Sequence, residues 1–389
     1  MKRLIIIVSG LIFCAVLAFL VLAPALLEQS MNKVLPLDAA PPGAQALDLH
    51  QKLFVGDLHT DSTLWRRDLR ERSSRGHVDL PRLRQGNVGL QVFTTVTKSP
   101  AGLNYESNST DALDSITALA VAQRWPLKTW GSLAERALYQ AKKLTDIATG
   151  YPDELKIIRT KSDLDTLVQQ RQSGSKVIGG IIGTEGSHAL DGDLSNIDRL
   201  YDAGFRVMGL QHFFDNHLGG SLHGNSGAGL TDFGRQAVTA MLDRQIIIDV
   251  AHSSPAVVRE VLAMSTAPVI VSHTGLQGHC QTPRNISDEL MQTIAARGGI
   301  IGIGFWDAAI CEPSAAGIVS AIQYGVELVG EDHIALGSDY DGSVTVPFDT
   351  AELARLTQEM LTSGMTERQI RKVMGGNMLR FFQAGLPAQ

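Results

Sequence analysis

The apolar positions of this chain fall into short runs that alternate with longer amphipathic stretches. Most of the short runs are rich in Val, Ile or Gly and lack interspersed polar residues, which is typical of strands buried on both faces. Eight such runs are candidate strands, at residues 53–57, 88–96, 177–184, 207–211, 246–250, 269–272, 300–304 and 334–337. Eight strands with intervening helices predict an α/β fold, namely a (β/α)8 TIM-type barrel, and an open doubly wound sheet is the alternative.

The amphipathic stretches between the candidate strands predict the helices of this fold. Clear examples are residues 197–203, 232–244, 255–264 and 288–297. One interval is longer than the others: residues 98–172, between the second and third candidate strands, contain helical patterns at 110–123 and 129–149. We expect a helical excursion there, beside or over the barrel mouth. Thr366 and Gln369 form a capping-box pattern that starts the last predicted helix.

The N-terminus carries a long apolar run. Lys2 and Arg3 precede residues 4–27, and the first charge after them is Glu28. The run is long enough to span a bilayer as a helix, and its positive flank predicts that the rest of the chain lies outside the cytoplasm. Residues 23–25 (Ala-Pro-Ala) also offer a small-x-small cleavage site. A retained membrane anchor and a cleaved export signal are therefore both open.

Three regions follow from these patterns. Residues 1–28 are a transmembrane anchor or signal segment, 29–48 a linker and 49–389 the barrel. The linker contains Pro36, Pro41 and Pro42, which predicts little structure. We expect the barrel to be membrane-anchored on the periplasmic or extracellular side, or to be secreted if the first segment is removed.

Charge and cysteine content exclude some classes of protein. The 34 basic and 40 acidic residues give a net charge of −6 without a basic stripe, which argues against a nucleic-acid partner. Cys14 lies in the apolar run, and Cys280 and Cys311 lie in the body of the chain. No CxxC motif or Cys/His cluster accompanies them, so a structural zinc finger is excluded. The sequence leaves open whether Cys280 and Cys311 pair.

Histidines and carboxylates recur where the candidate strands end. His59 and Asp61 follow the first strand and share one side of it, while Glu185, His252 and His273 end three other strands. A closed ring of parallel strands brings such positions to one mouth, and nitrogen and oxygen ligands suit zinc. We expect two Zn²⁺ ions per chain. One would be held by His59, Asp61 and Glu185, the other by His252, His273 and the same, bridging Glu185.

Six motifs, in order, resemble those of the membrane dipeptidase family, the renal-dipeptidase-like metallopeptidases. They are DLHTD at 57–61, TEGSH at 184–188, DVAH at 249–252, VSH at 271–273, PRN at 283–285 and GSDYDG at 337–342. The resemblance covers about residues 49–382. It implies a (β/α)8 barrel with a binuclear zinc centre that hydrolyses dipeptides, including those with a D-residue at the carboxyl side. A homodimer is usual for the family.

The resemblance also implies roles for individual residues. The metal ligands are His59, Asp61, Glu185, His252 and His273, the same set that the strand ends predict. His212 matches the histidine that faces the scissile carbonyl, Arg284 the arginine that receives the substrate carboxylate, and Asp339 an aspartate that binds the free amine or passes a proton to it. A hydroxide bridging the two ions is expected to attack the carbonyl. Leu58, Thr60 and Pro283 depart from the family pattern without removing a ligand.

Three other functions are alternatives to a dipeptidase. Another binuclear amidohydrolase, acting on a lactone, cyclic amide or β-lactam, is the nearest alternative. Arg284 argues against neutral lactones, which have no carboxylate for it to bind. A barrel that lost its activity would lack ligands, and all five are present. A nucleotide-binding protein is excluded because no glycine-rich loop follows the first strand. Asp341 is interpreted as a loop cap and His188 as a residue that orders the loop after Glu185.

Overall fold

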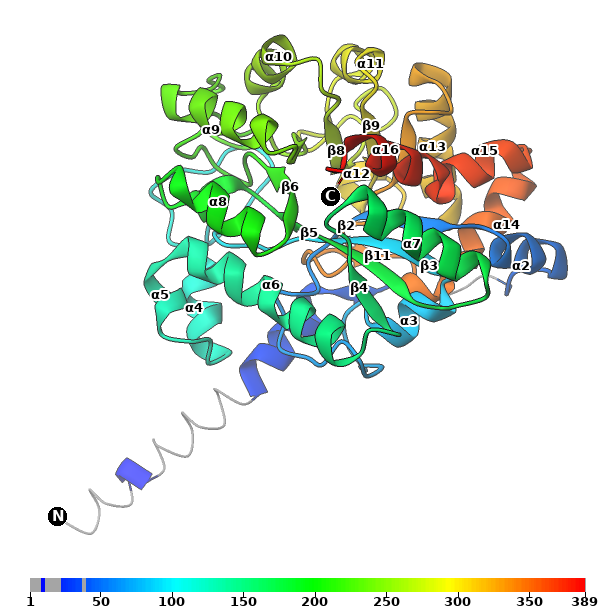
Figure 1. Cartoon of the computed structure of the whole chain (residues 1–389), viewed down its shortest axis with the longest axis horizontal. Helices are drawn as coiled ribbons and strands as arrows, with labels where there is room; N and C mark the ends of the chain where they lie inside the picture. The colour runs from blue at the N-terminus through cyan, green and yellow to red at the C-terminus, as the bar shows by residue number, and fades with distance from the viewer. Residues whose placement is uncertain (1–7, 11–21, 37–39, 389) are drawn as a thin grey trace.

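Eight parallel strands close into a barrel (Figure 1). The computed structural model describes residues 8–10, 22–36 and 40–388. The barrel strands are β2 (Val55–Thr60), β3 (Val88–Phe93), β5 (Ile178–Thr184), β6 (Phe205–Gly209), β7 (Ile247–Asp249), β8 (Ile270–Thr274), β9 (Ile300–Ile303) and β10 (Ile334–Leu336). Pairing of β3 with β5 and of β10 with β2 closes the ring. The barrel prediction is confirmed, each predicted strand matches one of these eight, and the open sheet is wrong.

The strands are apolar because both of their faces are covered. Every residue of the eight barrel strands is buried. Side chains from all eight strands pack together inside the ring, where Met378, Phe381 and Phe382 of α16 (Asn377–Gly385) join them. Ile247, Ile270 and Ile300 in this cluster are the first residues of their strands. Helix α16 therefore packs against the amino-terminal end of the barrel and leaves the carboxyl-terminal end for the site.

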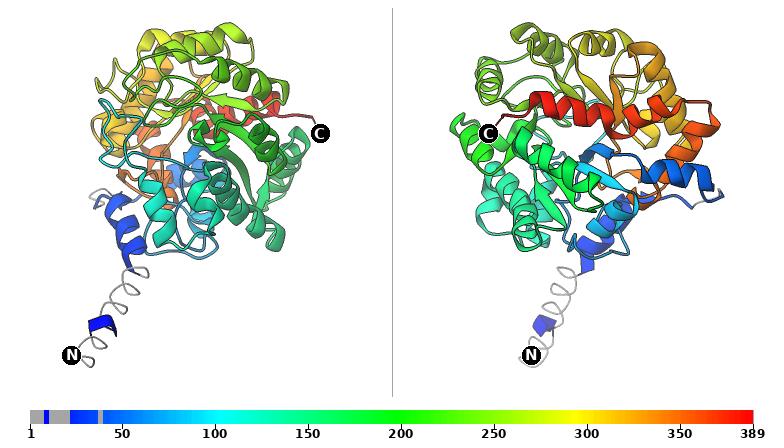
Figure 2. Two further views of the ribbon diagram at one scale, coloured as in Figure 1. Left: turned by 90° about the vertical axis from the view of Figure 1, so that its left-hand side faces the viewer. Right: turned by 45° about the vertical axis from the view of Figure 1, so that its right-hand side comes forward.

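Helices surround the ring, as Figure 1 and Figure 2 show. They include α8 (Ser195–Asp202), α9 (Asp232–Asp243), α10 (Pro255–Met264), α11 (Asp288–Ala296), α13 (Ala315–Val329) and α14 (Ala354–Thr362). Polar caps set where several of them begin. Thr231, Ser254 and Ser287 each accept a first-turn backbone N–H, at α9, α10 and α11. The capping box of Thr366 and Gln369 is present at α15 (Glu367–Arg371).

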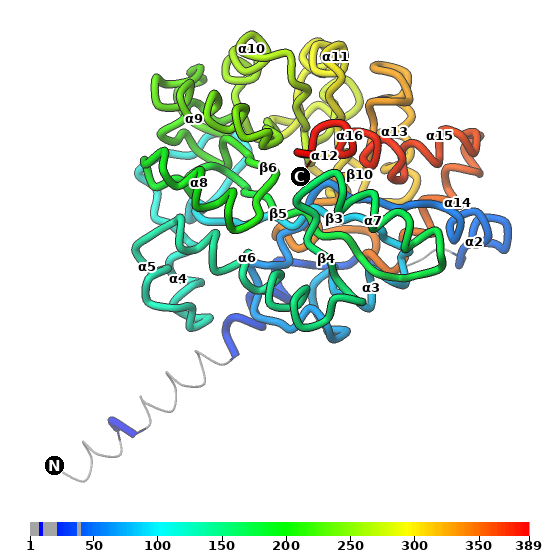
Figure 3. Tube along the Cα trace, in the orientation of Figure 1, coloured from blue at the N-terminus to red at the C-terminus, as the bar shows by residue number. Residues whose placement is uncertain are grey.

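The helical excursion between the second and third barrel strands is confirmed, with one addition. It contains α4 (Ser115–Ala122), α5 (Lys128–Gly131), α6 (Leu133–Gly150) and α7 (Lys161–Gln172), and Figure 3 traces α4 to α6 along one side of the barrel. A further strand, β4 (Leu155–Ile157), pairs with the first half of β5 outside the ring. Sequence patterns do not reveal β4, because three residues are too few to show a periodicity.

The region predicted as a linker, residues 29–48, is more ordered than expected. Residues 22–31 are helical, and β1 (Lys33–Val34) pairs in parallel with β11 (Thr345–Val346). Helix α2 (Ala44–Gln51) begins before the expected boundary. The expectation of little structure is therefore wrong for these parts. The order comes from contacts with residues about 300 positions away, which the local composition does not report.

Most of the predicted membrane anchor lies outside the described residues. Of residues 4–27, the structure describes 8–10 and 22–27. Within the part of the chain that it describes, no helix is both long and apolar enough to cross a membrane.

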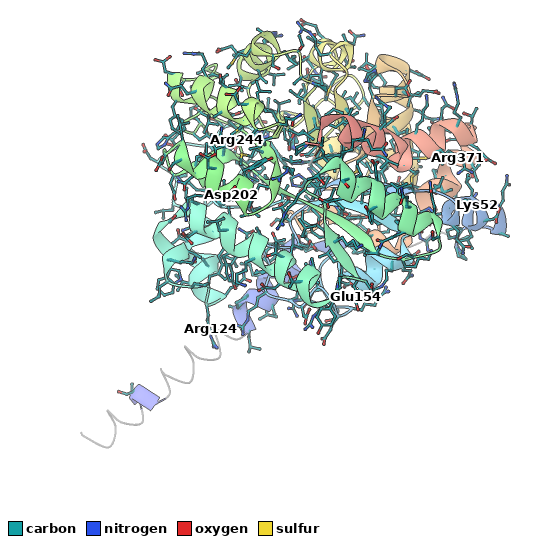
Figure 4. All side chains as sticks on the ribbon, in the orientation of Figure 1. Lys52, Arg124, Glu154, Asp202, Arg244 and Arg371 are labelled. Atoms are coloured by element: carbon teal, nitrogen blue, oxygen red, sulfur yellow. A yellow bond between two sulfur atoms is a disulfide. The ribbon has the colours of Figure 1, made fainter. Side chains whose placement is uncertain are left out.

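Charged side chains are spread around the outside of the barrel, as the six labelled residues in Figure 4 illustrate. Lys52, Glu154 and Arg244 each lie within 4.0 Å of an oppositely charged group, from Asp48, Arg84 and Asp198 respectively. Exposed pairs of this kind contribute about 0–1 kcal/mol each. The charges that matter for function are the buried ones described below.

Cys280 and Cys311 form a disulfide, which settles the question that the sequence left open. The bond ties the loop after β8 to the end of α12 (Asp307–Ile310). The same loop carries Arg284, and the Asn285 side chain donates to the carbonyl oxygens of Cys280 and Ala309. The disulfide and Asn285 together fix the backbone beside Arg284.

Replacing Cys280 and Cys311 by Ser is expected to destabilise the protein. The bond joins residues 31 positions apart. Loop closure on that scale corresponds to about 3–4 kcal/mol of unfolding free energy. Denaturant unfolding without reductant measures this, with Cys14→Ser as the control. Equal unfolding midpoints for the double variant and the wild type would contradict the prediction.

Candidate active site

The structure brings all eight residues singled out by the sequence to the carboxyl-terminal end of the barrel. Each lies in the second half of one of six strands or in the segment that follows that strand. They are His59 and Asp61 (β2), Glu185 (after β5), His212 (after β6), His252 (after β7), His273 and Arg284 (β8 and the loop after it) and Asp339 (after β10). All of them are buried. The closed ring explains why residues about 280 positions apart meet.

Glu185 lies at the centre of this group. Its Oε1 atom is 3.3 Å from His252 Nε2, 3.4 Å from His273 Nε2 and 3.5 Å from His59 Nε2. Its Oε2 atom is 3.3 Å from His212 Nε2. The Nε2 atoms of His252 and His273 are 2.9 Å apart. Four imidazoles from four strands therefore point their Nε2 atoms at one carboxylate.

Two overlapping sets of side chains could each hold an ion. One contains His59, Glu185, His273 and Asp339, and the other contains Glu185, His212 and His252. Glu185 belongs to both sets, as expected of a bridging ligand. The grouping otherwise differs from the predicted one: it includes Asp339 and His212 and leaves out Asp61, although the Asp61 Oδ1 atom is 3.6 Å from His59 Nε2.

Neighbouring hydroxyl and carbonyl groups orient these side chains. Ser272 Oγ lies 3.1 Å from His59 Nδ1 and 2.9 Å from His273 Nδ1. Thr94 Oγ1 donates to Asp61 Oδ1 at 2.6 Å, and His212 Nδ1–H donates to the Lys98 carbonyl at 3.1 Å. Each bond directs the remaining ligand atom toward the centre. Ser272, Thr94 and Lys98 have no predicted role. Only for Ser272 does the sequence point to the site, because Ser272 directly precedes His273.

Two buried carboxylates that the sequence analysis also left without a role hold the turns of the site in place. Asp57 accepts from the backbone N–H of Ser338 at 2.9 Å and from its hydroxyl at 2.5 Å. Asp249 accepts from the backbone N–H groups of Ser272 at 2.9 Å and of Ala251 at 3.1 Å. Burial raises the pKa of both carboxyls, and these hydrogen bonds oppose the shift. Both aspartates begin a motif named above, DLHTD at 57–61 and DVAH at 249–252, in which the aspartate precedes a histidine by two or three residues.

The electrostatics of the site favour a cation. Burial, followed by the nearby charges of Asp61 and Asp339, holds the pKa of Glu185 well above its usual value. Burial also raises the pKa of Asp339 to about 8, against the opposing effect of His59. For His252 and His273, burial holds the pKa well below its usual value. Crowded carboxyls beside neutral imidazoles are the donor set that divalent metal ions such as zinc use. The residues present therefore fit a metal centre.

A cavity of about 450 Å³ opens onto these residues. Asp61, Glu185, His212 and His252 line its polar side. Its other side is apolar and aromatic, formed by residues that include Leu64, Trp65, Tyr105, Phe213 and Trp306. The cavity is large enough for a small molecule with both charged and apolar groups.

Arg284 is a buried cation in the wall of this cavity. Its Nη1 and Nη2 atoms donate to the carbonyl oxygens of Ala251 at 3.2 Å and of His273 at 2.9 Å. The guanidinium also lies 5.3 Å from the centre of the Trp306 ring. These two carbonyls and His252 Nε2, 3.4 Å from Nη2, are neutral, so within the described residues no direct ion pair compensates its charge. A ligand carboxylate would do so.

The comparison with protein families identifies the chain. The model of the membrane dipeptidase family, peptidase family M19, matches residues 43–385. The chain belongs to this family. It is a family of metallo-dipeptidases, hydrolases that act on peptide bonds. The match includes the eight site residues and the helical excursion between the second and third barrel strands.

Individual relatives of this M19 chain are distant in sequence. Dipeptidase 3 of Mus musculus is 26% identical in an alignment 371 residues long. The alignment covers 87% of this chain and 66% of that protein. The chain thus spans just under two thirds of that relative's length. A probable dipeptidase of Pseudomonas aeruginosa, PvdM, superposes with a TM-score of 0.71 at 20% identity, covering 87% of this chain and 97% of its own.

One solved relative carries a ligand. It is a metallopeptidase from Rhodobacter sphaeroides, liganded with a phosphinate mimic of the dipeptide L-Ala-D-Ala. Its TM-score is 0.69 at 22% identity, and the alignment covers 86% of this chain and 99% of that one. At this level of identity, the structural likenesses show that the fold is shared.

Two further residues of the motifs lie away from the central group. Asp341 is buried, its carboxylate accepts from the backbone N–H of His77 at 2.6 Å, and it forms an ion pair with Arg67. It therefore joins distant loops rather than capping its own. His188 packs edge-on against Phe214, and neither of its ring nitrogens has a hydrogen-bond partner among the residues that the structure describes.

The substitution Glu185→Gln is expected to stabilise the metal-free protein and to reduce the stabilisation that zinc provides. It removes a crowded, desolvated carboxylate, so the metal-free variant should be more stable than the metal-free wild type by about 1–3 kcal/mol. Added zinc should raise the melting temperature of the wild type and much less that of the variant. Calorimetry after chelation and after zinc addition tests both, with the exposed Glu289→Gln as control. A metal-free variant less stable than the wild type would contradict the prediction.

Proposed function

We propose that this protein is a zinc-dependent dipeptidase with a binuclear centre bridged by Glu185. The observation that carries the proposal is the order of groups along the cavity. Asp339 lies 3.9 Å from His59, whose ring is 3.8 Å from that of His273. His252 follows His273, and the Arg284 guanidinium lies 3.4 Å from His252 Nε2. A cation and a carboxyl group thus both lie beside the candidate metal ligands, at different residues of that group.

This order matches the charges of a free dipeptide. Its carboxylate would bind Arg284 and its ammonium group would lie near Asp339, which places the peptide bond over the histidines and Glu185. Zinc bound there would supply an activated water at neutral pH and polarise the scissile carbonyl. Fixing both ends of the substrate excludes longer peptides, because their added residues would have to occupy the space of Arg284 or Asp339.

His212 faces the substrate as a hydrogen-bonding group. Burial lowers its pKa to about 4, and its Nδ1–H is committed to the Lys98 carbonyl. The neutral ring therefore presents an acceptor at Nε2. It donates to the developing oxyanion only after it takes a proton, such as the one that the attacking water gives up. The negative charge that develops on the oxygen favours this protonated form.

Asp339 is suited to move the second proton. Burial raises its pKa to about 8 in the metal-free site, so this carboxyl group can take up and release a proton near neutral pH. It lies where the amino side of the substrate is expected, so it can deliver a proton to the leaving nitrogen. The same carboxyl group accepts hydrogen bonds from an ammonium group once it has lost that proton.

A lactone or cyclic amide is the alternative substrate class. A neutral cyclic substrate would leave Arg284 buried and uncompensated, which is costly. This disfavours the alternative, except for ring substrates that carry a carboxylate, such as β-lactams. We also propose that the protein acts outside the cytoplasm. The Cys280–Cys311 disulfide supports that location, because such bonds persist in oxidising compartments.

The function is tested with the full-length protein in detergent. It is assayed as purified, after chelation and after zinc is restored, on L-Ala-L-Ala, L-Ala-D-Ala and a tripeptide. Activity confined to the dipeptides, lost on chelation and regained with zinc, is the expected result, and Glu185→Gln serves as the blank. Absence of dipeptide turnover by protein with two zinc ions bound would refute the proposal and redirect the search to cyclic amides.

The role of Arg284 is tested by comparing Arg284→Met with the wild type. The kcat/KM for a dipeptide is expected to fall about 100- to 1,000-fold, because a buried charged hydrogen bond is lost. For the corresponding dipeptide amide, which has no carboxylate, the change should be much smaller. Arg259→Met, at an exposed arginine, is the matched control. Equal losses on the acid and on the amide would show that Arg284 does not receive the carboxylate.

A further inference from the structure

The helix of residues 22–31 forms part of the cavity wall. Leu27 and Met31 line the same cavity as Glu185, His212 and Asp339. The family match begins at residue 43, so this wall precedes the part of the chain that the family model covers. In both views of Figure 2 the dark-blue helix meets the body of the protein.

A buried ion-pair cluster holds the helix in place. Glu28 has no exposed surface. Its two carboxylate oxygens accept from Arg67 Nε at 2.5 Å and from Arg75 Nε at 2.7 Å. Arg67 also pairs with Asp341, two residues after Asp339. A buried carboxylate of this kind is costly to separate from its partners, so the helix is anchored rather than loosely apposed.

The residues after the helix brace the loop that carries Asp339. Asn32 Oδ1 accepts from the Ser343 backbone N–H at 2.8 Å, and the Lys33 N–H donates to the Val344 carbonyl at 3.1 Å. His77 joins the two segments, because its Nδ1 accepts from the Asp341 N–H at 2.9 Å and its Nε2 lies 3.2 Å from the Lys33 carbonyl oxygen.

This loop needs outside support. Asp339, Asp341 and Ser343 have φ angles of 59°, 65° and 66°, in the left-handed region that residues other than glycine seldom occupy. Three such residues within five positions persist only where surrounding contacts determine the backbone. The N-terminal segment supplies several of those contacts, so its position and that of Asp339 are coupled.

We propose that Leu27 and Met31 form the specificity-determining wall of a subsite for the side chain of the substrate's amino-terminal residue. The inference rests on the proposed dipeptidase function, in which the amino group lies near Asp339. Gly342, Ser343 and Val344 continue from Asp339 and line the cavity beside the two side chains. Leu64, Trp65, Ile116 and Leu119 complete an apolar lining. The subsite therefore takes a large apolar side chain, such as that of leucine.

The proposal is tested with the double variant Leu27→Ala/Met31→Ala in the full-length protein. Alanine keeps the helix and removes the apolar wall. The matched control is Leu22→Ala/Leu26→Ala, two positions of the same helix that are 57% and 62% exposed and do not line the cavity. The substrates are L-Leu-L-Ala, L-Ala-L-Leu and L-Ala-L-Ala.

The expected result is selective. The kcat/KM of the double variant for L-Leu-L-Ala should fall about tenfold relative to that for L-Ala-L-Ala, mainly through KM, since losing contact with a few methylene groups has effects of this size. The ratio for L-Ala-L-Leu to L-Ala-L-Ala should stay within about twofold, and the control should match the wild type on all three dipeptides.

A second variant tests whether the ion pairs of Glu28 hold the wall formed by Leu27 and Met31 in place. Glu28→Gln weakens both arginine contacts, so it should lower the kcat/KM for L-Leu-L-Ala more than that for the other two dipeptides and speed hydrogen exchange at the Ser343 amide. Equal losses on all three dipeptides, or a loss on L-Ala-L-Leu alone, would overturn the proposal. So would unchanged ratios in both variants. Failure of the wild type to cleave any dipeptide would instead refute the proposed function, which the wall variants do not test.

Discussion

The site depends on one unfavourable arrangement: Glu185 is buried within reach of two other carboxyls and four imidazoles. Its Oε1 atom is 3.3–3.5 Å from three of the histidines. Burial and the charges of Asp61 and Asp339 raise its pKa well above the usual value. A protein keeps such a cluster when another group compensates it, and divalent cations do so for this donor set. The hydroxyl groups of Ser272 and Thr94 hold these ligands in place, and Asp249 accepts from the backbone N–H of Ser272 and so holds Ser272 itself.

The closed barrel makes this arrangement possible. Its strands are buried on both faces, and α16 packs against the amino-terminal end, so the chemistry is confined to the other end. The substrate cavity is then built by segments outside the ring. The excursion supplies Ile116 and Leu119, the β8 loop supplies Arg284, and the N-terminal helix supplies Leu27 and Met31. The barrel positions the candidate catalytic residues, and these additional segments shape the cavity that a substrate has to enter.

Much of the fold and the site could be read from the sequence because the signals are local. The eight apolar runs predicted the eight strands, and the position of His59, Glu185 or His252 at a strand end predicted the mouth at which they meet. The missed parts depend on partners far away in the chain. Strand β4 is too short to show a pattern, and β1 becomes a strand through its pairing with β11. Ser272 and Thr94 contribute to the site through hydrogen bonds of their hydroxyl groups to the candidate ligands, and these bonds depend on the folded chain.

The sequence by itself therefore determined the barrel, the family and the set of candidate site residues, since strand periodicity and motif order are properties of neighbouring residues. Only the tertiary structure decided the grouping around Glu185, the pairing of Cys280 with Cys311 and the place of the N-terminal segment. Glu28 shows why. Its position marks it only as the charge that ends the apolar run. The folded chain brings Arg67 and Arg75 to it, and so places residues from the predicted anchor and the predicted linker in the wall of the candidate active site.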